Sequence, residues 1–314
     1  MKITIIGAGA MGSLFGSLLA DSGQDVLLID IWQAHIDAVN ARGVCIESGE
    51  KTRQIAVKAS SRILDGKNSD LVIVFVKSTQ TGPAADAALA CLNGTGHVLT
   101  LQNGMGNADV ISEVVPPDRV VAGTTSHGAT LLGPGRIRHA GAGPTLIGLW
   151  SKKSSAGLEP IKRVFCDAGL ETTIEADIHR VIWKKLIINI GINAITALTG
   201  IKNGGIVDRP PTGDLVRAAV KEACDVAAAH HVTLADDIID QVFSVARATG
   251  PNRSSMGQDV DHQRQTEIDA INGAVVKLAE AKEIPVPVNR TLTALIKTLE
   301  KSYGPEKNYR QGEK

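Results

Sequence analysis

The chain has 314 residues, enough for two domains that each bury a core of their own. It carries 33 Lys and Arg against 33 Asp and Glu, so we expect neither a nucleic acid nor an anionic membrane as partner. The four cysteines, Cys45, Cys91, Cys166 and Cys224, lie far apart and form no CxxC pair. This spacing argues against a disulfide framework and a metal site, and it fits a protein of the reducing cytoplasm.

A glycine-rich motif lies between a predicted strand and a predicted helix. Residues 2–6 are a short β-branched run typical of a buried parallel strand, and residues 13–22 have the pattern of a helix closed by glycine. Between them stand Gly7, Ala8, Gly9, Ala10, Met11 and Gly12. In this GxGxxG pattern, Gly7 permits a tight turn, Gly9 lets the backbone approach a pyrophosphate, and Gly12 lets the helix pack closely on the strand. The motif therefore predicts a dinucleotide site.

Asp30 bears on which dinucleotide binds. It ends a second predicted strand, residues 25–29, at about the expected ~20 residues after the glycines. A carboxylate there hydrogen-bonds a ribose 2′-hydroxyl and repels a 2′-phosphate, and the next four residues supply no cation. The alternative is that Asp30 only caps a helix over residues 31–41. We expect NAD(P)H as cofactor, with NADH favoured over NADPH.

Further strand ends place two more polar residues at the same edge of the predicted sheet. Lys77 follows the strand at residues 70–76, and Asn103 follows the strand at residues 97–101. Ligands bind at the carboxyl ends of parallel strands, so both are candidate contacts. Each has a plainer explanation, since Lys77 fits a solvated loop and Asn103 with its glycine fits an ordinary turn. Other predicted elements are helices at 82–92 and 155–168, and strands at 119–124, 136–139, 145–149 and 171–174.

The composition changes near Asp177, beyond which no β-rich run remains. Helices are predicted at residues 183–199, 212–230, 234–248, 255–282 and 289–302. The predicted fold is therefore α/β, with a Rossmann-type parallel sheet in an N-terminal domain (1–176) and an all-helical C-terminal domain (177–314). The apolar stretch at 186–201 contains two asparagines and two glycines, so we do not interpret it as a membrane span.

A polar stripe interrupts the apolar helix at 183–199. Lys185, Asn189 and Asn193 are spaced by four residues, which keeps all three on one helix face. A buried ammonium and two buried carboxamides are costly unless polar groups meet them, either from other helices or from a small molecule in a cleft. Lys185 is the best candidate for a general acid that protonates a carbonyl oxygen, because burial can tune a lysine pKa.

A second polar cluster follows at residues 252–267. It contains Asn252, Ser255 and Glu267. Ser255 with Gln258 also forms a capping box, so Ser255 can simply start a helix. By default Glu267 is a boundary residue in a surface ion pair, but if it faces Lys185 it can orient the acid. His127 and His262 have no specific partner in the sequence and are not assigned a role.

These residues resemble those of the ketopantoate reductase family (2-dehydropantoate 2-reductase), over nearly the whole chain. The resemblance rests on the glycine motif, on Lys77, and on residues 102–106, 124–127, 183–186, 203–204, 254–259 and 266–273. It implies reduction of ketopantoate to pantoate, a step towards pantothenate and coenzyme A. Matched by position, Lys185 would be the general acid and Asn103 would touch cofactor and substrate, with Glu267 beside both ligands. The substrate contacts would be Asn189, Asn193, Asn203, Asn252 and Ser255.

One departure from the family pattern keeps alternatives open. The family commonly uses NADPH and has a basic residue after the second strand, whereas this chain has Asp30 and Ile31. Another 2-keto acid is therefore an alternative substrate. A β-hydroxyacid dehydrogenase would fit Lys185 and Asn189 but leaves the motifs at 254–259 and 266–273 unexplained. The non-enzyme alternative is an NAD(H)-sensing binding protein, and a homodimer stays open.

Overall fold

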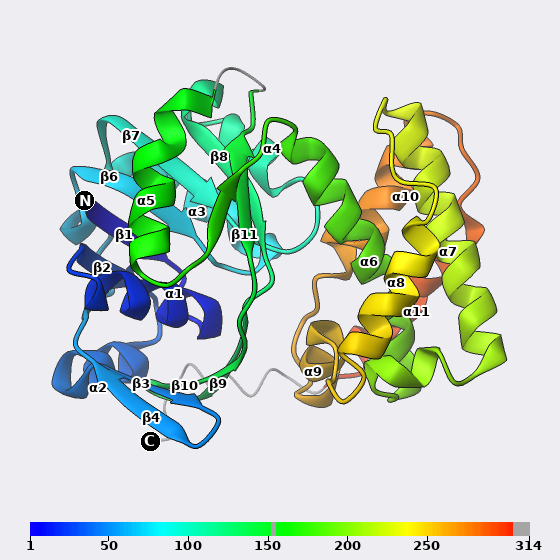
Figure 1. The fold of residues 1–314 in the computed structure, drawn as a ribbon, viewed down its shortest axis with the longest axis horizontal. Coiled ribbons are helices and arrows are strands. Elements are labelled where there is room, and N and C mark those ends of the chain that lie inside the picture. The colour runs from blue at the N-terminus through cyan, green and yellow to red at the C-terminus, as the bar shows by residue number, and fades with distance from the viewer. Residues whose placement is uncertain (152–154, 304–314) are drawn as a thin grey trace. The chain divides into compact units, whose positions relative to one another are not determined.

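A computed structural model describes residues 1–151 and 155–303, and the chain separates into two compact units (Figure 1). Among the described residues, the first unit comprises Met1–Gln102 and Asn107–Ile178. The second comprises the chain from His179 onward together with the four-residue segment Asn103–Gly106. Within the described residues, the chain therefore passes from one unit to the other three times.

The first unit is built on an eight-stranded sheet. Its strands are β1 (Lys2–Ile6), β2 (Asp25–Ile29), β5 (Lys58–Ser60), β6 (Ser69–Val74), β7 (Leu92–Thr100), β8 (Val120–Thr125), β11 (Thr145–Leu149) and β12 (Thr172–Ile174). Their order is β12-β11-β8-β7-β6-β1-β2-β5, and every neighbouring pair is parallel except β8 with β11. The predicted parallel sheet is confirmed, with one antiparallel pair added.

Helices cover both faces of this sheet (Figure 1). They are α1 (Ala10–Asp21), α2 (Gln33–Arg42), α3 (Thr81–Cys91), α4 (Asn107–Ser112) and α5 (Glu159–Asp167). Helices α1 and α5 share one face, where the rings of Phe15 and Phe165 lie 6.0 Å apart between centroids. Ile5 of β1 packs in the same core as these rings. The next residue back, Thr4, points to the opposite face, as strand alternation requires, and α3 packs there.

A smaller sheet completes the first unit, and most of it was not predicted. Its order is β4-β3-β10-β9, formed by Lys51–Ile55, Val44–Ser48, Arg136–Gly141 and Gly128–Gly133. Only β10 was predicted from the sequence. Four of the five residues of β4 are exposed, so this strand carries no apolar run that pattern reading detects.

The second unit is built from helices joined by loops, and its described residues include no strand. Its helices are α6 (Ile178–Thr199), α7 (Pro210–Ala229), α8 (Ile238–Ala248), α9 (Ser255–Asp261), α10 (Asn272–Glu280) and α11 (Pro287–Lys301). They share one apolar core, to which α6 contributes Leu186, Ile187 and Ile190. Among the described residues, α6 is the one helix long and apolar enough to span a membrane, yet 61% of its most apolar window is buried within the protein. Core helices of globular proteins have the same composition.

The predicted helix at residues 255–282 is wrong as a single helix. Helix α9 ends at Asp261, and α10 begins only at Asn272. Between them Gln263 adopts a left-handed conformation with φ of 53°. The backbone N–H of Thr266 donates to Glu300 Oε1 at 2.7 Å, a contact from a distant part of the sequence. Such tertiary hydrogen bonds override the local helical pattern.

Candidate active site

The glycine motif forms a close-packed turn that leaves one position open. A Cβ on Gly7, whose φ is +98°, would lie 2.7 Å from the backbone N of Val76, and one on Gly12 would lie 2.0 Å from Gly7 O. No atom lies within 4 Å of the corresponding position on Gly9. Gly9 is the N-cap of α1, with Ala8 buried before it and Ala10 and Met11 partly exposed after it. The helix N-terminus and the space beside Gly9 fit the pyrophosphate of a dinucleotide.

Asp30 lies directly after β2 and is not the cap of α2. The N-cap is Trp32, whose backbone N–H donates to Asp30 Oδ1 at 3.0 Å. The carboxylate is partly exposed at the end of β2. The simple capping explanation is therefore corrected, since the carboxylate stabilises the turn before α2 and does not cap the helix.

Lys77 lies at the carboxyl end of the sheet, just beyond β6. It is exposed and precedes the 3₁₀ turn Ser78–Gln80. Nearby, Gln102 Nε2 donates to Val76 O at 2.8 Å and to Thr81 Oγ1 at 2.9 Å. The side chain of Gln102 thus ties the ends of β6 and β7 together, a role that the sequence did not indicate.

The polar stripe of α6 is present in the second unit. Lys185 is largely buried, and desolvation lowers its pKa to about 8, while the carboxylate of Glu267 acts in the opposite direction. The adjacent Lys184 is exposed, as its different helix face requires. Asn189 is partly exposed and Asn193 is 5% exposed. A lysine with this pKa carries a proton at neutral pH and can also give it up.

The segment after β7 brings Asn103 to Glu267. Asn103 Nδ2 donates to Glu267 Oε2 at 3.4 Å, a long hydrogen bond, and Met105 N donates to Ala270 O at 2.8 Å. Gly104 has φ of +83°, and a Cβ there would lie 2.4 Å from Ala270 O. Glu267 precedes the 3₁₀ turn Ile268–Ala270, so it is not part of a continuous helix as predicted. Lys185, Glu267 and Asn103 therefore belong to one polar group within the second unit.

The remaining predicted substrate residues lie around the start of α9. Asn203 Nδ2 donates to Thr249 Oγ1 at 2.9 Å, and its backbone N–H donates to Asn252 O at 3.0 Å. The capping prediction for Ser255 is wrong. Ser254 is the N-cap, because its Oγ accepts from Gly257 N at 3.0 Å. Ser255 and Asn252 are both exposed beside it.

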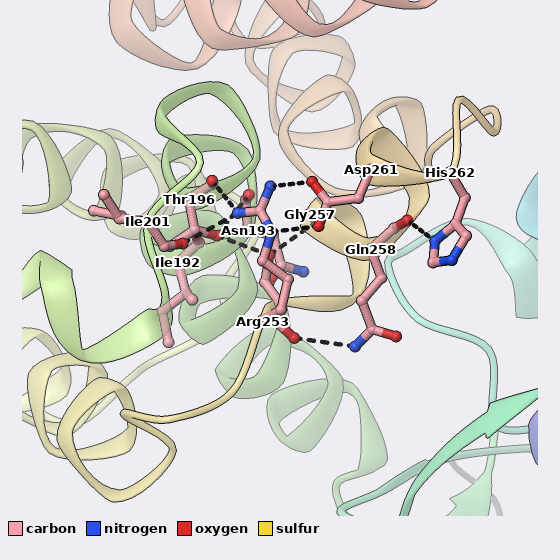
Figure 2. Close-up of polar contacts among 10 residues, drawn as sticks. Ile192, Asn193, Thr196, Ile201, Arg253, Gly257, Gln258, Asp261 and His262 are labelled. Atoms are coloured by element: carbon pink, nitrogen blue, oxygen red, sulfur yellow. Dashed lines mark hydrogen bonds and ion pairs between the residues drawn. The ribbon is translucent and has the colours of Figure 1, made fainter. Parts of the chain in front are cut away.

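Arg253 is a residue that sequence reasoning missed, and Figure 2 shows it at the centre of this region. Its Nη1 donates to the carbonyl of Thr196 in the last turn of α6 and, at 3.1 Å, to that of Ile201 just after the helix. Its Nε and Nη2 each donate at 2.8 Å to the carboxylate of Asp261, and these bonds hold the pKa of Asp261 below its usual value. Arg253 thus joins α6 to α9, and no periodicity in the sequence signals a contact of this kind.

Three buried side-chain amide atoms in this unit make no hydrogen bond within the described residues. They are Asn193 Nδ2 and Asn203 Oδ1, which belong to predicted substrate residues, and Asn272 Oδ1 at the start of α10. Buried polar atoms are normally paired, so a donor and an acceptor of this kind suit a polar ligand or water. By contrast, His127 and His262, to which no role is assigned, each contact another residue of their own unit. His127 Nδ1 lies 3.1 Å from His139 Nε2, and His262 Nδ1 lies 2.7 Å from Gln258 O.

Comparison with known proteins identifies the family of this chain. The family model described as ketopantoate reductase PanE/ApbA matches residues 3–152, and the model of its C-terminal part matches residues 177–300. The 2-dehydropantoate 2-reductase of Pyrococcus horikoshii is 39% identical over 98% of this chain and 100% of its own length. That of Halobacterium salinarum is 38% identical over 95% and 98%.

Solved structures give the same result. A PanE/ApbA family ketopantoate reductase from Ralstonia eutropha JMP134 has a TM-score of 0.90 and 33% identity, covering 96% of this chain and 99% of that one. D-mandelate dehydrogenase with NADH and anilino(oxo)acetate also has a TM-score of 0.90, at 28% identity over 96% and 99%. With a family match over both units and relatives of this similarity, the chain belongs to the ketopantoate reductase family of oxidoreductases.

Proposed function

We propose that this protein reduces ketopantoate to pantoate with a nicotinamide cofactor, on the route to pantothenate and coenzyme A. In this proposal residues 1–176 bind the dinucleotide and residues 177–314 bind substrate. The observation that carries it is Lys185, whose pKa of about 8 results from burial beside Glu267 on an asparagine-lined helix. Membership of the family supports the same reaction.

When bound, the reduced nicotinamide supplies a hydride to the keto carbon. Lys185 then donates a proton from its ammonium to the developing alkoxide, and its lowered pKa makes this transfer easier than for an ordinary lysine. Glu267 keeps the ammonium oriented and in its protonated form, since its carboxylate raises the lysine pKa against the effect of burial. Asn103, which donates to Glu267, helps to position that carboxylate.

The substrate contacts follow from the chemistry of amides and hydroxyls. Asn189, Asn193 and Asn203 offer both donors and acceptors to a hydroxylated carboxylate, and Asn252 and Ser255 add exposed groups near the start of α9. The unpaired Asn193 Nδ2 and Asn203 Oδ1 support this assignment, because binding would satisfy both atoms.

The cofactor contacts are assigned to the glycine turn from Gly7 to Gly12, to Lys77 and to Asp30. NADH is the preferred cofactor in this proposal. The support is that Asp30 is partly exposed directly after β2, where a carboxylate can accept a hydrogen bond from a ribose hydroxyl. A 2′-phosphate would face this carboxylate without a compensating cation on the following residues.

A second candidate is the reduction of a different 2-keto acid. The support is the similarity to D-mandelate dehydrogenase, which was solved with NADH. The direct test is consumption of NADH and NADPH, at equal concentration, by the purified protein with ketopantoate and with phenylglyoxylate. Turnover of ketopantoate supports the first proposal, and turnover of phenylglyoxylate alone supports the second. Tight NADH binding without turnover of any 2-keto acid would indicate a sensor rather than an enzyme.

The proposal extends to location and assembly. The four cysteines are free, which suits the cytoplasm, and the partner is a small 2-keto acid rather than a macromolecule. A homodimer is the assembly to test, by light scattering coupled to size exclusion. A monomeric mass that persists at micromolar concentration would reject it.

A further inference from the structure

His35 is a fully buried histidine on α2 that none of the chemistry above uses. Its two ring nitrogens contact separate parts of the first unit. The backbone N–H of Gly135, in the turn between β9 and β10, donates to His35 Nδ1 at 3.2 Å. On the other side, Nε2 lies 3.2 Å from Ser13 Oγ in the first turns of α1.

These contacts define the tautomer of the ring. Nδ1 accepts a hydrogen bond from a backbone N–H, so in the neutral imidazole the proton resides on Nε2. Nε2 therefore donates to Ser13 Oγ, and Ser13 is left to donate its own proton elsewhere. Burial lowers the pKa of His35, with Asp30 acting in the opposite direction, so the ring stays neutral at neutral pH.

Ser13 connects His35 to the glycine turn through a hydrogen bond. Ser13 Oγ donates to the carbonyl of Ala8 at 2.9 Å. The Ala8–Gly9 peptide is planar and trans, so its N–H points opposite to its C=O. Fixing the Ala8 carbonyl towards Ser13 therefore fixes the Gly9 N–H in the other direction, at the residue beside which open space was found.

We infer that His35 and Ser13 are positioning residues for cofactor binding, acting through the Ala8–Gly9 peptide. The inference rests on the proposed function, since it assumes that the pyrophosphate binds at the glycine turn. The relay runs from the Gly135 N–H to His35, from His35 to Ser13, and from Ser13 to the Ala8 carbonyl. Without it, the peptide loses the bond that sets the direction of its N–H.

The same imidazole supports the residue proposed to select NADH. The ring of Trp32 stacks on His35, with centroids 5.4 Å apart and planes inclined by 21°. The backbone N–H of Trp32 in turn donates to Asp30 Oδ1. His35 is thus connected to both ends of the proposed dinucleotide site, the glycine turn and the carboxylate after β2.

A matched pair of serine variants tests the inference. Ser69, the first residue of β6, resembles Ser13 in burial and in its hydrogen bond to a backbone carbonyl. Both are fully buried, and Ser69 Oγ donates to Gly66 O at 2.8 Å and contacts Thr4 Oγ1 at 2.8 Å. Ser13→Ala and Ser69→Ala should therefore lower the melting temperature by similar amounts. Only Ser13→Ala should raise the Kd for NADH, by about five- to tenfold, the range expected for one lost hydrogen bond.

Two histidine variants add a rescue experiment. His35→Phe removes both ring contacts and should raise the NADH Kd about tenfold, whereas His35→Gln retains a donor towards Ser13 and should recover most of the affinity. In both variants, kcat at saturating cofactor should stay within about twofold of wild type, because His35 does not touch the reacting atoms. Equal Kd values for Ser13→Ala and Ser69→Ala would overturn the inference. Absence of NADH and NADPH binding by the wild type would instead overturn the proposed function.

Discussion

The glycine turn and the region around α6 differ in how far their polar groups are hydrogen-bonded within the protein. Around the turn, each polar group of the relay has a partner within the first unit, as His35, Ser13 and the Ala8 carbonyl demonstrate. Around α6, Asn193 Nδ2 and Asn203 Oδ1 are buried without a hydrogen bond in the described part of the chain. One region uses its hydrogen bonds to fix the backbone, and the other leaves side-chain groups available.

This difference matches what each ligand offers. A pyrophosphate is recognised by backbone N–H groups, which must be held in direction but need no side chain of their own. A small keto acid is recognised by side chains. Their donors and acceptors must not already be used in hydrogen bonds within the protein. The comparison therefore predicts that substitutions near α6 affect catalysis and substrate, while substitutions near the turn affect the cofactor.

The largest effect is expected at Lys185. Lys185→Met removes the proposed general acid while keeping an unbranched side chain in the apolar surroundings, and kcat should fall by about 10²–10⁴-fold. Lys184→Met is the matched control, since this neighbour is exposed and should leave kcat within about twofold. Steady-state kinetics with both ligands saturating gives the answer. Wild-type kcat in Lys185→Met would remove Lys185 from the mechanism.

A smaller effect is expected at Asp30, and on the cofactor alone. Asp30→Asn removes the charge that repels a 2′-phosphate and weakens the bond to the ribose. The ratio of kcat/KM for NADH over NADPH should fall by about 10–100-fold, since a hydrogen bond to a charged group contributes ~1.5–3 kcal/mol. Asp37→Asn, on the exposed surface of α2, is the control. An unchanged ratio would leave Asp30 with only its bond to Trp32.

The pH profile should report the pKa of Lys185. The acid works only when protonated, so kcat/KM for the keto acid should be level below the pKa of about 8 and decline above it, about tenfold per pH unit. Glu267→Gln removes the carboxylate that raises this pKa, and the decline should move to lower pH. A profile that stays level to pH 10 would contradict the assignment.

Arg253 should affect substrate binding more than the chemical step. Arg253→Met breaks the contacts that join α6 to α9, so the keto acid KM should rise roughly tenfold and stability should fall by about 2 kcal/mol. Arg209→Met is the control, because this exposed arginine makes one backbone contact, with Gly205 O at 3.0 Å. Urea denaturation and steady-state kinetics separate the two readouts. A fall in kcat without a change in KM would reject the positioning role.

The smallest effects are expected at Asn193, where a substitution should raise stability but weaken substrate binding. Asn193→Leu replaces a buried amide whose Nδ2 has no hydrogen bond within the described residues by an apolar group of similar size, which should stabilise the protein by about 1 kcal/mol. The same change should raise the keto acid KM, since a proposed contact is lost. A stability gain without a kinetic change would mean that Asn193 does not touch substrate.

Much of the fold could be predicted because the main strands are apolar and end at glycine or polar residues. β1 and β2 have the predicted limits, and the helical second half follows from the absence of β-rich runs. β4 could not be found because it is exposed, and the break after α9 depends on a contact with Glu300. Residue type identified Lys185 and the asparagines as candidates, whereas Arg253 and His35 gain their partners only through folding.

The segment Asn103–Gly106 has a consequence for how this chain can be divided. It lies in sequence between β7 and α4, yet Asn103 donates a hydrogen bond to Glu267 and Met105 donates one to Ala270, both in the helical unit. A fragment cut before α6 would leave the helical unit without these four residues. Recombination that exchanges the C-terminal half between two relatives would face the same mismatch, so this tetrapeptide should be inherited together with the helices it contacts rather than with the strand that precedes it.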